Sequence, residues 1–165
     1  MQLSILTIGK MKAGSKGSAP EMDLLNRYVE RSQKAGRQLG FAGPKILEWN
    51  ESRAQTAALR KEEEASQMLS SLSAGATLIC LDERGKDISS EDLSQLMRRS
   101  LDNSTPQIAF AIGGPDGHAD QMREQASHTI RFGKMTWPHQ FARIMIAEQI
   151  YRAITILSNH PYHRV

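Results

Sequence analysis

The stretch Gln107–Gly117, which reads QIAFAIGGPDG, decides the fold. An apolar run ends abruptly in a glycine-rich run, which is typical of a buried strand followed by a tight loop. Other short apolar runs occur at four places, with helix-like spacing of apolar residues between them. These runs cover residues 3–8, 45–49, 76–81 and 129–132. Strands that alternate with helices predict an α/β domain with a mostly parallel sheet flanked by helices.

The segments between the predicted strands carry helix signals. Pro20 suits the first turn of a helix, and Ser89 with Asp92 resembles a capping box. We expect Lys61–Glu64 on the solvent side of one long helix, and we expect residues 82–86 to turn away from the third strand. The predicted helices begin near residues 20, 54, 90, 120 and 138.

Length and cysteine content narrow the class of protein. The chain has 165 residues, so a single domain over residues 1–165 is expected. Its one cysteine, Cys80, excludes an internal disulfide and a multi-cysteine zinc site. No run approaches the ~20 apolar residues of a membrane helix, and residues 1–9 lack the features of a signal peptide. These observations predict a cytoplasmic protein that binds neither a metal nor a membrane.

The charge is unevenly distributed along the chain. The formal net charge is only +3, but residues 1–50 and residues 131–165 each carry a net +4, whereas residues 51–92 carry a net −4. One interpretation is that the two basic ends converge on a polyanion. The other is an ordinary solvated surface whose composition fluctuates.

The last predicted helix, residues 138–157, is apolar on more than one face. A helix that is apolar nearly all round is buried on several sides. In a domain of this size one side would pack on the sheet and another on a second copy of the chain, which predicts an isologous homodimer. A central helix in a monomer is the alternative.

Three segments are candidates for a ligand site, because ligands of parallel sheets bind beyond the carboxyl ends of the strands. They follow Leu81, follow Ile112, and cover Phe132–Pro138. The glycine run after Ile112 lets a ligand approach the backbone closely. It matches neither GxGxxG nor a P-loop, which argues against a Rossmann dinucleotide site and a Walker ATPase. A plain tight turn is the alternative.

The end of the chain concentrates polar chemistry in His160, Tyr162, His163 and Arg164. A guanidinium pairs with phosphate, a phenol ring stacks on a base, and an imidazole exchanges protons near neutral pH. A frayed polar tail is the alternative.

Four other polar or reactive residues are interpreted as structural. We expect His139 to be a satisfied structural histidine, and Glu148 to pair with Arg152 four residues later. Cys80 is expected to be an inert buried thiol.

Four motifs together resemble one known family. They are GGPDG at residues 113–117, TWPH at 136–139, AEQIYRA at 147–153 and HPYHR at 160–164. The set resembles the bacterial ribosomal RNA large subunit methyltransferase H family, of the SPOUT class of knotted methyltransferases. The resemblance covers the whole chain in strand order and is densest in the second half.

The resemblance implies an activity and an architecture. Members of that family transfer a methyl group from S-adenosylmethionine to N3 of a pseudouridine in 23S rRNA, acting on the assembled ribosome. The implied partner is 23S rRNA in the large subunit or in the 70S ribosome. The implied fold is an α/β sheet with a deep trefoil knot near the C-terminus, in a homodimer that needs no metal.

The resemblance also implies a pocket for S-adenosylmethionine. Leu81 and the loop at 132–137 would sandwich the adenine, and Gly113 would lie near the ribose or the methionine portion. The implied pocket residues are Leu81, Gly113, Phe132, Gly133, Lys134, Met135, Thr136 and Trp137.

We expect the tail to supply the chemistry at the base. His163 is the hypothetical base or orienting group, and Arg164 would hold an RNA phosphate or the developing uracil anion. His160 and Tyr162 would shape the pocket of the target base. The tail would act in its own chain or complete the pocket of the partner.

Three other functions stay open. One is a ribosome-binding assembly factor that keeps the fold without catalysis, and another is a SPOUT methyltransferase that acts on tRNA. The third is a nucleotide-binding module. A chain of 165 residues leaves no room for a separate RNA-binding domain, so we expect naked 23S fragments to be poor substrates.

Overall fold

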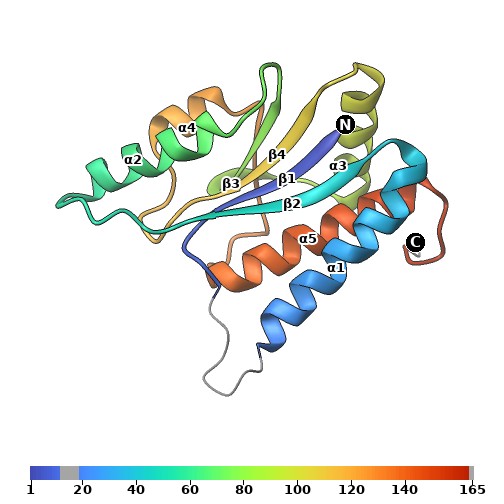
Figure 1. The fold of residues 1–165 in the computed structure, drawn as a ribbon, viewed down its shortest axis with the longest axis horizontal. Coiled ribbons are helices and arrows are strands. Elements are labelled where there is room, and N and C mark those ends of the chain that lie inside the picture. The colour runs from blue at the N-terminus through green and yellow to red at the C-terminus, as the bar shows by residue number, and fades with distance from the viewer. Residues whose placement is uncertain (12–18, 164–165) are drawn as a thin grey trace.

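The computed structural model describes residues 1–11 and 19–163, and its elements alternate along the chain as predicted (Figure 1). The sequence predicts a basic, glycine-containing loop over residues 10–18, and residues 12–18 of it lie outside the described residues. The elements are β1 (Gln2–Ile8), α1 (Pro20–Gly36), the short 3-10 turn η1 (Arg37–Leu39), β2 (Ala42–Trp49), α2 (Ala57–Ser70), β3 (Thr77–Asp87), α3 (Ser90–Asp102), β4 (Gln107–Ile112), α4 (Asp120–Gln125), β5 (His128–Arg131) and α5 (His139–Leu157).

The five strands form one parallel sheet in the order β2-β1-β4-β3-β5. The central strands β1 and β4 are almost wholly buried, which explains why they read as continuous apolar runs. Their register pairs Thr7 with Ile112, and Leu81 of β3 also pairs with Ile112. The carboxyl ends of β1 and β4 therefore meet at one edge of the sheet, beside Leu81 of β3. The α/β class and the parallel sheet are confirmed, and the knot stays a prediction.

Helices cover both faces of the sheet. Figure 1 shows α2 and α4 on one side and α1 and α5 on the other, where α3 also packs on α5. The larger apolar core lies under α1, α3 and α5, and a smaller one lies under α2 and α4. The capping box predicted for α3 is present: Asp92 N donates to Ser89 Oγ, and Ser89 N donates to the Asp92 carboxylate.

The apolar character of α5 is explained largely within one chain. The helix packs between α1 and α3, and residues on several of its faces are buried. Glu148 pairs with Arg152 on this helix, as predicted from their spacing. Three large apolar side chains just before α5 and in its first turn stay exposed: Met135, Trp137 and Phe141. None of the described helices combines the length and apolarity that crossing a bilayer requires.

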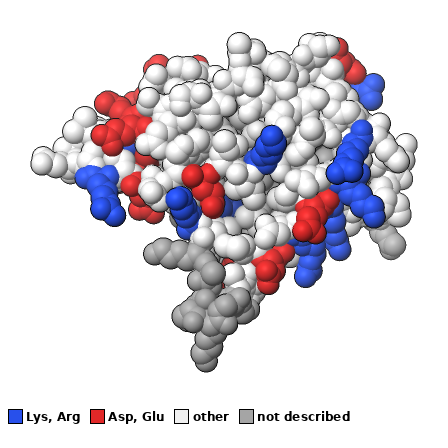
Figure 2. All heavy atoms as spheres, in the orientation of Figure 1, with Lys and Arg blue, Asp and Glu red and all other residues white. Residues whose placement is uncertain are grey.

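Basic residues of the first and last parts of the sequence lie on α1 and α5, two helices that pack on each other. The Arg31 guanidinium of α1 lies 5.9 Å from the centre of the Tyr151 ring of α5. In the view of Figure 2, acidic side chains gather near α2, whereas basic and acidic side chains both lie over α1. The convergence of the two basic ends on a polyanion stays a prediction.

The expected turn at residues 82–86 is wrong, because β3 continues to Asp87. Its pairing with β5 is interrupted: Leu81 and Lys86 both pair with Ile130, so the four residues between them form a bulge outside the ladder of pairs. At Gly85 the chain passes so close to Ile130 that an added Cβ would lie 2.4 Å from the Ile130 carbonyl carbon. The second strand also begins earlier than predicted, at Ala42, along the edge of the sheet.

We predict that Gly85→Ala destabilises the protein by about 1–3 kcal/mol, the usual cost of overpacking, because the backbone of Ile130 cannot move aside as a side chain would. Urea unfolding of parent and variant measures the difference. Arg84→Ala is the matched control: Arg84 is exposed and its substitution should change the free energy of unfolding by less than about 0.5 kcal/mol. Equal stability of the two variants would contradict the close approach.

Candidate active site

A cavity of about 290 Å³ opens at the edge of the sheet where β4 ends and the bulge of β3 after Leu81 begins. All eight residues predicted for the donor pocket line it, although they come from three separate segments. Leu81 belongs to β3, Gly113 follows β4, and Phe132–Trp137 connects β5 to α5. The three segments that the carboxyl-end rule selected therefore line one cavity, and their role in binding the donor stays a prediction.

The loop at residues 132–137 is closed on itself. Trp137 Nε1 donates a hydrogen bond of 2.9 Å to the carbonyl oxygen of Phe132. Gly133 has φ of +82°, a backbone conformation that residues other than glycine rarely adopt. The side chains of Met135 and Trp137 stay largely exposed at the mouth of the cavity. The loop therefore offers backbone groups and an aromatic ring in a fixed arrangement.

A buried histidine that the sequence did not single out joins the two strand ends. His118 Nε2 lies 3.2 Å from the carbonyl oxygen of Leu81 and 3.3 Å from that of Ala111. Burial lowers the pKa of His118, so the ring is neutral and its Nε2–H serves as a donor to these carbonyls. The Arg123 guanidinium donates a hydrogen bond of 2.8 Å to the backbone carbonyl oxygen of His118.

The glycine run after β4 forms a tight turn that leaves no space for a side chain at Gly113 or Gly114. Gly117 N donates to the carbonyl oxygen of Gly114 at 2.9 Å, and Gly117 has φ of +79°. A Cβ added at Gly113 would lie 2.9 Å from the carbonyl carbon of Gly117. This wall of the cavity is therefore bare backbone, to which a ligand has close access.

Helix α2 holds this turn from outside the cavity. Arg60 Nε donates to Asp116 of the turn at 2.7 Å. Glu64 was expected to face solvent, but only 5% of its surface is exposed, and its Oε1 accepts from Ser52 N at 2.9 Å. A Cβ added at Gly114 would lie 2.8 Å from Glu64 Oε2. The carboxylate thus packs directly against the glycine, a contact that the helical pattern of α2 does not encode.

His139 also lines the cavity, beside Gly114. Burial, together with the nearby positive charge of Arg143, lowers the pKa of His139 and favours the neutral ring. Arg143 is buried and donates to the carbonyl oxygens of Ile8 and Gly9, at 3.0 and 2.6 Å, and to Glu48 at 2.8 Å. It therefore fixes the first turn of α5 to the carboxyl ends of β1 and β2.

The structure does not bring the predicted tail residues to this cavity. None of His160, Tyr162 and His163 lines it, and Arg164 lies outside the described residues. The tail follows the C-terminal end of α5, whereas the cavity lies at its first turn (Figure 1). The Tyr162 hydroxyl reaches back only to Glu148, nine residues beyond His139 and so about 14 Å further along the helix axis.

Within the chain the tail is held by aromatic and charged contacts. The Tyr162 hydroxyl donates to Glu148 Oε1 at 3.0 Å, and its ring packs on Tyr151 and on the Arg152 guanidinium. Burial, with help from this hydrogen bond, raises the pKa of Tyr162.

His163 approaches the start of α3. Its Nε2 lies 2.7 Å from Glu91 Oε1, yet no described residue gives either ring nitrogen a well-formed hydrogen bond. Within this chain the His163 imidazole therefore lies against the Glu91 carboxylate at the start of α3.

Comparison with known proteins decides the family. A family model described as "Predicted SPOUT methyltransferase" matches residues 1–163. The chain belongs to the SPOUT methyltransferase family. The sequence resemblance to this class is thereby confirmed.

Full-length relatives of this SPOUT methyltransferase carry one name. Proteins called ribosomal RNA large subunit methyltransferase H, from Brucella anthropi and from Methylocella silvestris, are each 49% identical over 99% of both chains. One from Rhizobium etli is 46% identical over the full length of both chains. A solved structure called a probable methyltransferase, from Bordetella pertussis Tohama I, superposes with a TM-score of 0.51 at 15% identity, covering 92% of this chain and 95% of that one. The superposition supports the fold alone.

We predict that Gly114→Ala weakens the site of this SPOUT methyltransferase. The new methyl group would meet Glu64 Oε2 at 2.8 Å and Ile8 Cγ2 at 3.1 Å, so the turn must shift. The expected results are a loss of stability of about 1–3 kcal/mol and a loss of affinity for S-adenosylmethionine, measured by urea unfolding and calorimetry. The double variant Gly114→Ala/Glu64→Ala makes room and should recover part of both. No recovery would contradict the proposed contact.

A pH prediction follows from Glu64. Burial raises the pKa of Glu64, with the nearby negative charges of Asp116 and Glu51 adding to it, although the Ser52 N–H opposes the shift. Because the raised pKa lies above that of the unfolded chain, the parent loses stability as the pH rises from the ordinary carboxyl pKa through the raised value. Glu64→Gln should match the parent at acidic pH and become the more stable protein toward pH 7, in unfolding measured across that range. A parent that gains on the variant as the pH rises would contradict the burial argument.

Proposed function

We propose that the protein transfers a methyl group from S-adenosylmethionine to N3 of a pseudouridine in 23S rRNA of the assembled ribosome, in the cytoplasm. The observation that carries the proposal is the convergence of Leu81, Gly113 and the 132–137 loop on one cavity in a SPOUT methyltransferase chain. The names of the full-length relatives support an rRNA of the large subunit as the substrate class.

The cavity suits S-adenosylmethionine by its chemistry. Its volume is near the lower end of the ~300–1,000 Å³ range of small-molecule sites. Leu81 and Trp137 offer apolar surface for a flat purine, and the closed loop offers backbone groups to read its edge. Gly113 allows close approach of the ribose or methionine portion. No described group of three or more His, Cys, Asp or Glu side chains is arranged to hold a metal ion.

The bound donor supplies a methyl group that its sulfonium already activates, so the protein contributes mainly alignment. The C–S bond breaks as the N3–C bond forms, and the proton on N3 must leave. A ring nitrogen of His163 accepts that proton in our proposal. Arg164 stabilises the developing uracil anion or holds a phosphate, and His160 and Tyr162 shape the base pocket.

The tail acts in the pocket of a partner chain. Within one chain Tyr162 is tied to Glu148, well away from the cavity, so His163 does not reach the donor. A homodimer that sets the tail of one copy against the cavity of the other joins the two halves of the site. The exposed apolar side chains of Met135, Trp137 and Phe141 lie next to the cavity and support a partner at this place.

We expect tritiated-methyl transfer to 70S ribosomes from a strain that lacks this gene, with the label mapped to N3 of one pseudouridine of 23S rRNA. Ribosomes from the parent strain, which are already methylated, are the control. Naked 23S fragments should react poorly, because the proposed recognition depends on the shape of the assembled ribosome. Failure to bind S-adenosylmethionine at millimolar concentration would favour a catalytically inactive assembly factor, and faster transfer to tRNA would favour a tRNA enzyme.

Mixed dimers test whether the tail acts in the partner's site. Gly113→Val blocks the cavity and His163→Ala removes the proposed base, so each homodimer should be inactive. After subunit exchange at equal amounts, half of the dimers are mixed and each holds one intact site, which predicts about one quarter of the parent activity. Zero activity in the mixture would mean that each tail serves its own chain. A His163→Ala homodimer with parent activity would remove His163 from the mechanism.

A further inference from the structure

The mouth of the cavity carries cations that the described protein does not use to hold itself together. Five basic side chains line it: Lys61, Arg84, Arg123, Arg131 and Lys134. Two of them are committed to carboxylates, since Arg123 lies 3.1 Å from Asp82 and Arg131 lies 2.7 Å from Asp87. The other three form no ion pair with any described carboxylate.

The three unpaired cations come from separate parts of the chain. Lys61 lies on α2, Arg84 on the bulge of β3, and Lys134 on the loop before α5. Arg84 and Lys134 are exposed, and Lys61 is half-buried. Only the fold brings them to one cavity mouth, so their shared position is not a consequence of a charged run in the sequence.

The carboxylates at the same mouth do not neutralise this charge. Asp82 is paired with Arg123, and Asp116 is paired with Arg60. Among the described residues that line the cavity, Glu83 is the one carboxylate left without an ion pair. Three free cations therefore face one free carboxylate, which leaves a net positive mouth.

We propose that Lys61, Arg84 and Lys134 bind the phosphodiester backbone of the RNA substrate beside the donor cavity. The inference rests on the proposed function and adds the contacts that hold the RNA. The donor has a single carboxylate and needs at most one cation, whereas three cations from three segments fit successive phosphates of a polyanion. Arginine binds phosphate through a planar fork and lysine as a point charge, so both residue types serve this role.

The proposal predicts a measurable dependence on salt. Each phosphate that a cation neutralises releases counterions, which adds about 0.7 to the slope of log K against log salt for single-stranded nucleic acid. For large ribosomal subunits from cells that lack the methylation, Lys61→Ala/Arg84→Ala should reduce the magnitude of this negative slope by about 1.4, and Lys134→Ala by about 0.7. Glu83→Gln should tighten binding, because it removes the one free carboxylate. Pelleting of subunits at several KCl concentrations and constant Mg²⁺ measures binding without turnover.

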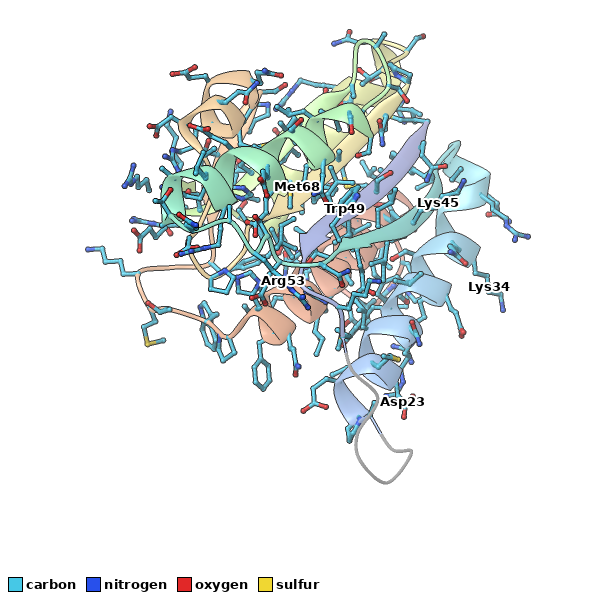
Figure 3. The ribbon with its side chains drawn as sticks, turned by 60° about the vertical axis from the view of Figure 1, so that its left-hand side comes forward. Asp23, Lys34, Lys45, Trp49, Arg53 and Met68 are labelled. Carbon is cyan, nitrogen blue, oxygen red and sulfur yellow. The ribbon has the colours of Figure 1, made fainter. Side chains whose placement is uncertain are left out.

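Lys45→Ala is the matched control. Lys45 is an exposed lysine on β2, the edge strand at the opposite side of the sheet from β5 (Figure 3). It forms no ion pair with a described residue, and its removal should leave the slope at the parent value. Thermal melting of each variant checks that all are folded at the assay temperature.

The affinity for S-adenosylmethionine distinguishes two possible ligands of these cations, the RNA phosphates and the carboxylate of the donor. Calorimetry with S-adenosylmethionine should give the parent affinity for Lys61→Ala/Arg84→Ala. A loss of donor affinity with the parent salt slope would overturn the proposal and assign the cations to the donor carboxylate. A parent slope for the double variant, or an equal fall for Lys45→Ala, would also overturn it. If the parent transfers no methyl group yet these slopes change as expected, the proposed function fails and the RNA contacts stand.

Discussion

The turn after β4 excludes side chains on the side where it meets the rest of the protein. A Cβ at Gly113 would overlap the turn itself, and one at Gly114 would overlap Glu64 and Ile8. This close packing sets the rest of the site. It lets the buried carboxylate of Glu64 rest against the backbone, it brings Asp116 within reach of Arg60, and it leaves the cavity wall as bare peptide. His118 then holds the same wall to the neighbouring strand end through the carbonyl of Leu81.

Helix α5 sets the spacing between the cavity and the tail. Its first turn is fixed by the buried guanidinium of Arg143, which binds the carbonyls that end β1. Further along, Glu148 accepts hydrogen bonds from both Arg152 and Tyr162, so the tail is held against the helix at Glu148. A rigid helix that is fixed near its start by Arg143 and holds the tail at its middle through Glu148 leaves little freedom for the tail to approach the cavity of its own chain.

The fold could be predicted from sequence because apolar residues form short continuous runs in the buried strands and recur at helical spacing in the helices. The alternation of apolar runs and helical stripes located the elements, and the carboxyl-end rule located the pocket segments. The predictions that were wrong concern features that depend on contacts between residues far apart in the sequence. The extension of β3 to Asp87 has no apolar pattern and relies on Gly85 passing Ile130. The burial of Glu64 depends on Ser52 and Gly114, and the position of the tail depends on Tyr162 folding back onto α5. No local pattern carries such information.

The indole–carbonyl bond between Trp137 and Phe132 has a consequence for the energetics of ligand capture. Ordering a free backbone costs about 1–2 kcal/mol per residue, a cost that a ligand must offset when it organises a mobile loop. Here the six residues of the loop are already drawn into a ring by that bond, with Gly133 supplying the bend. A ligand that binds to this preorganised loop loses little affinity to the ordering of the chain, so most of the free energy of its contacts contributes to binding.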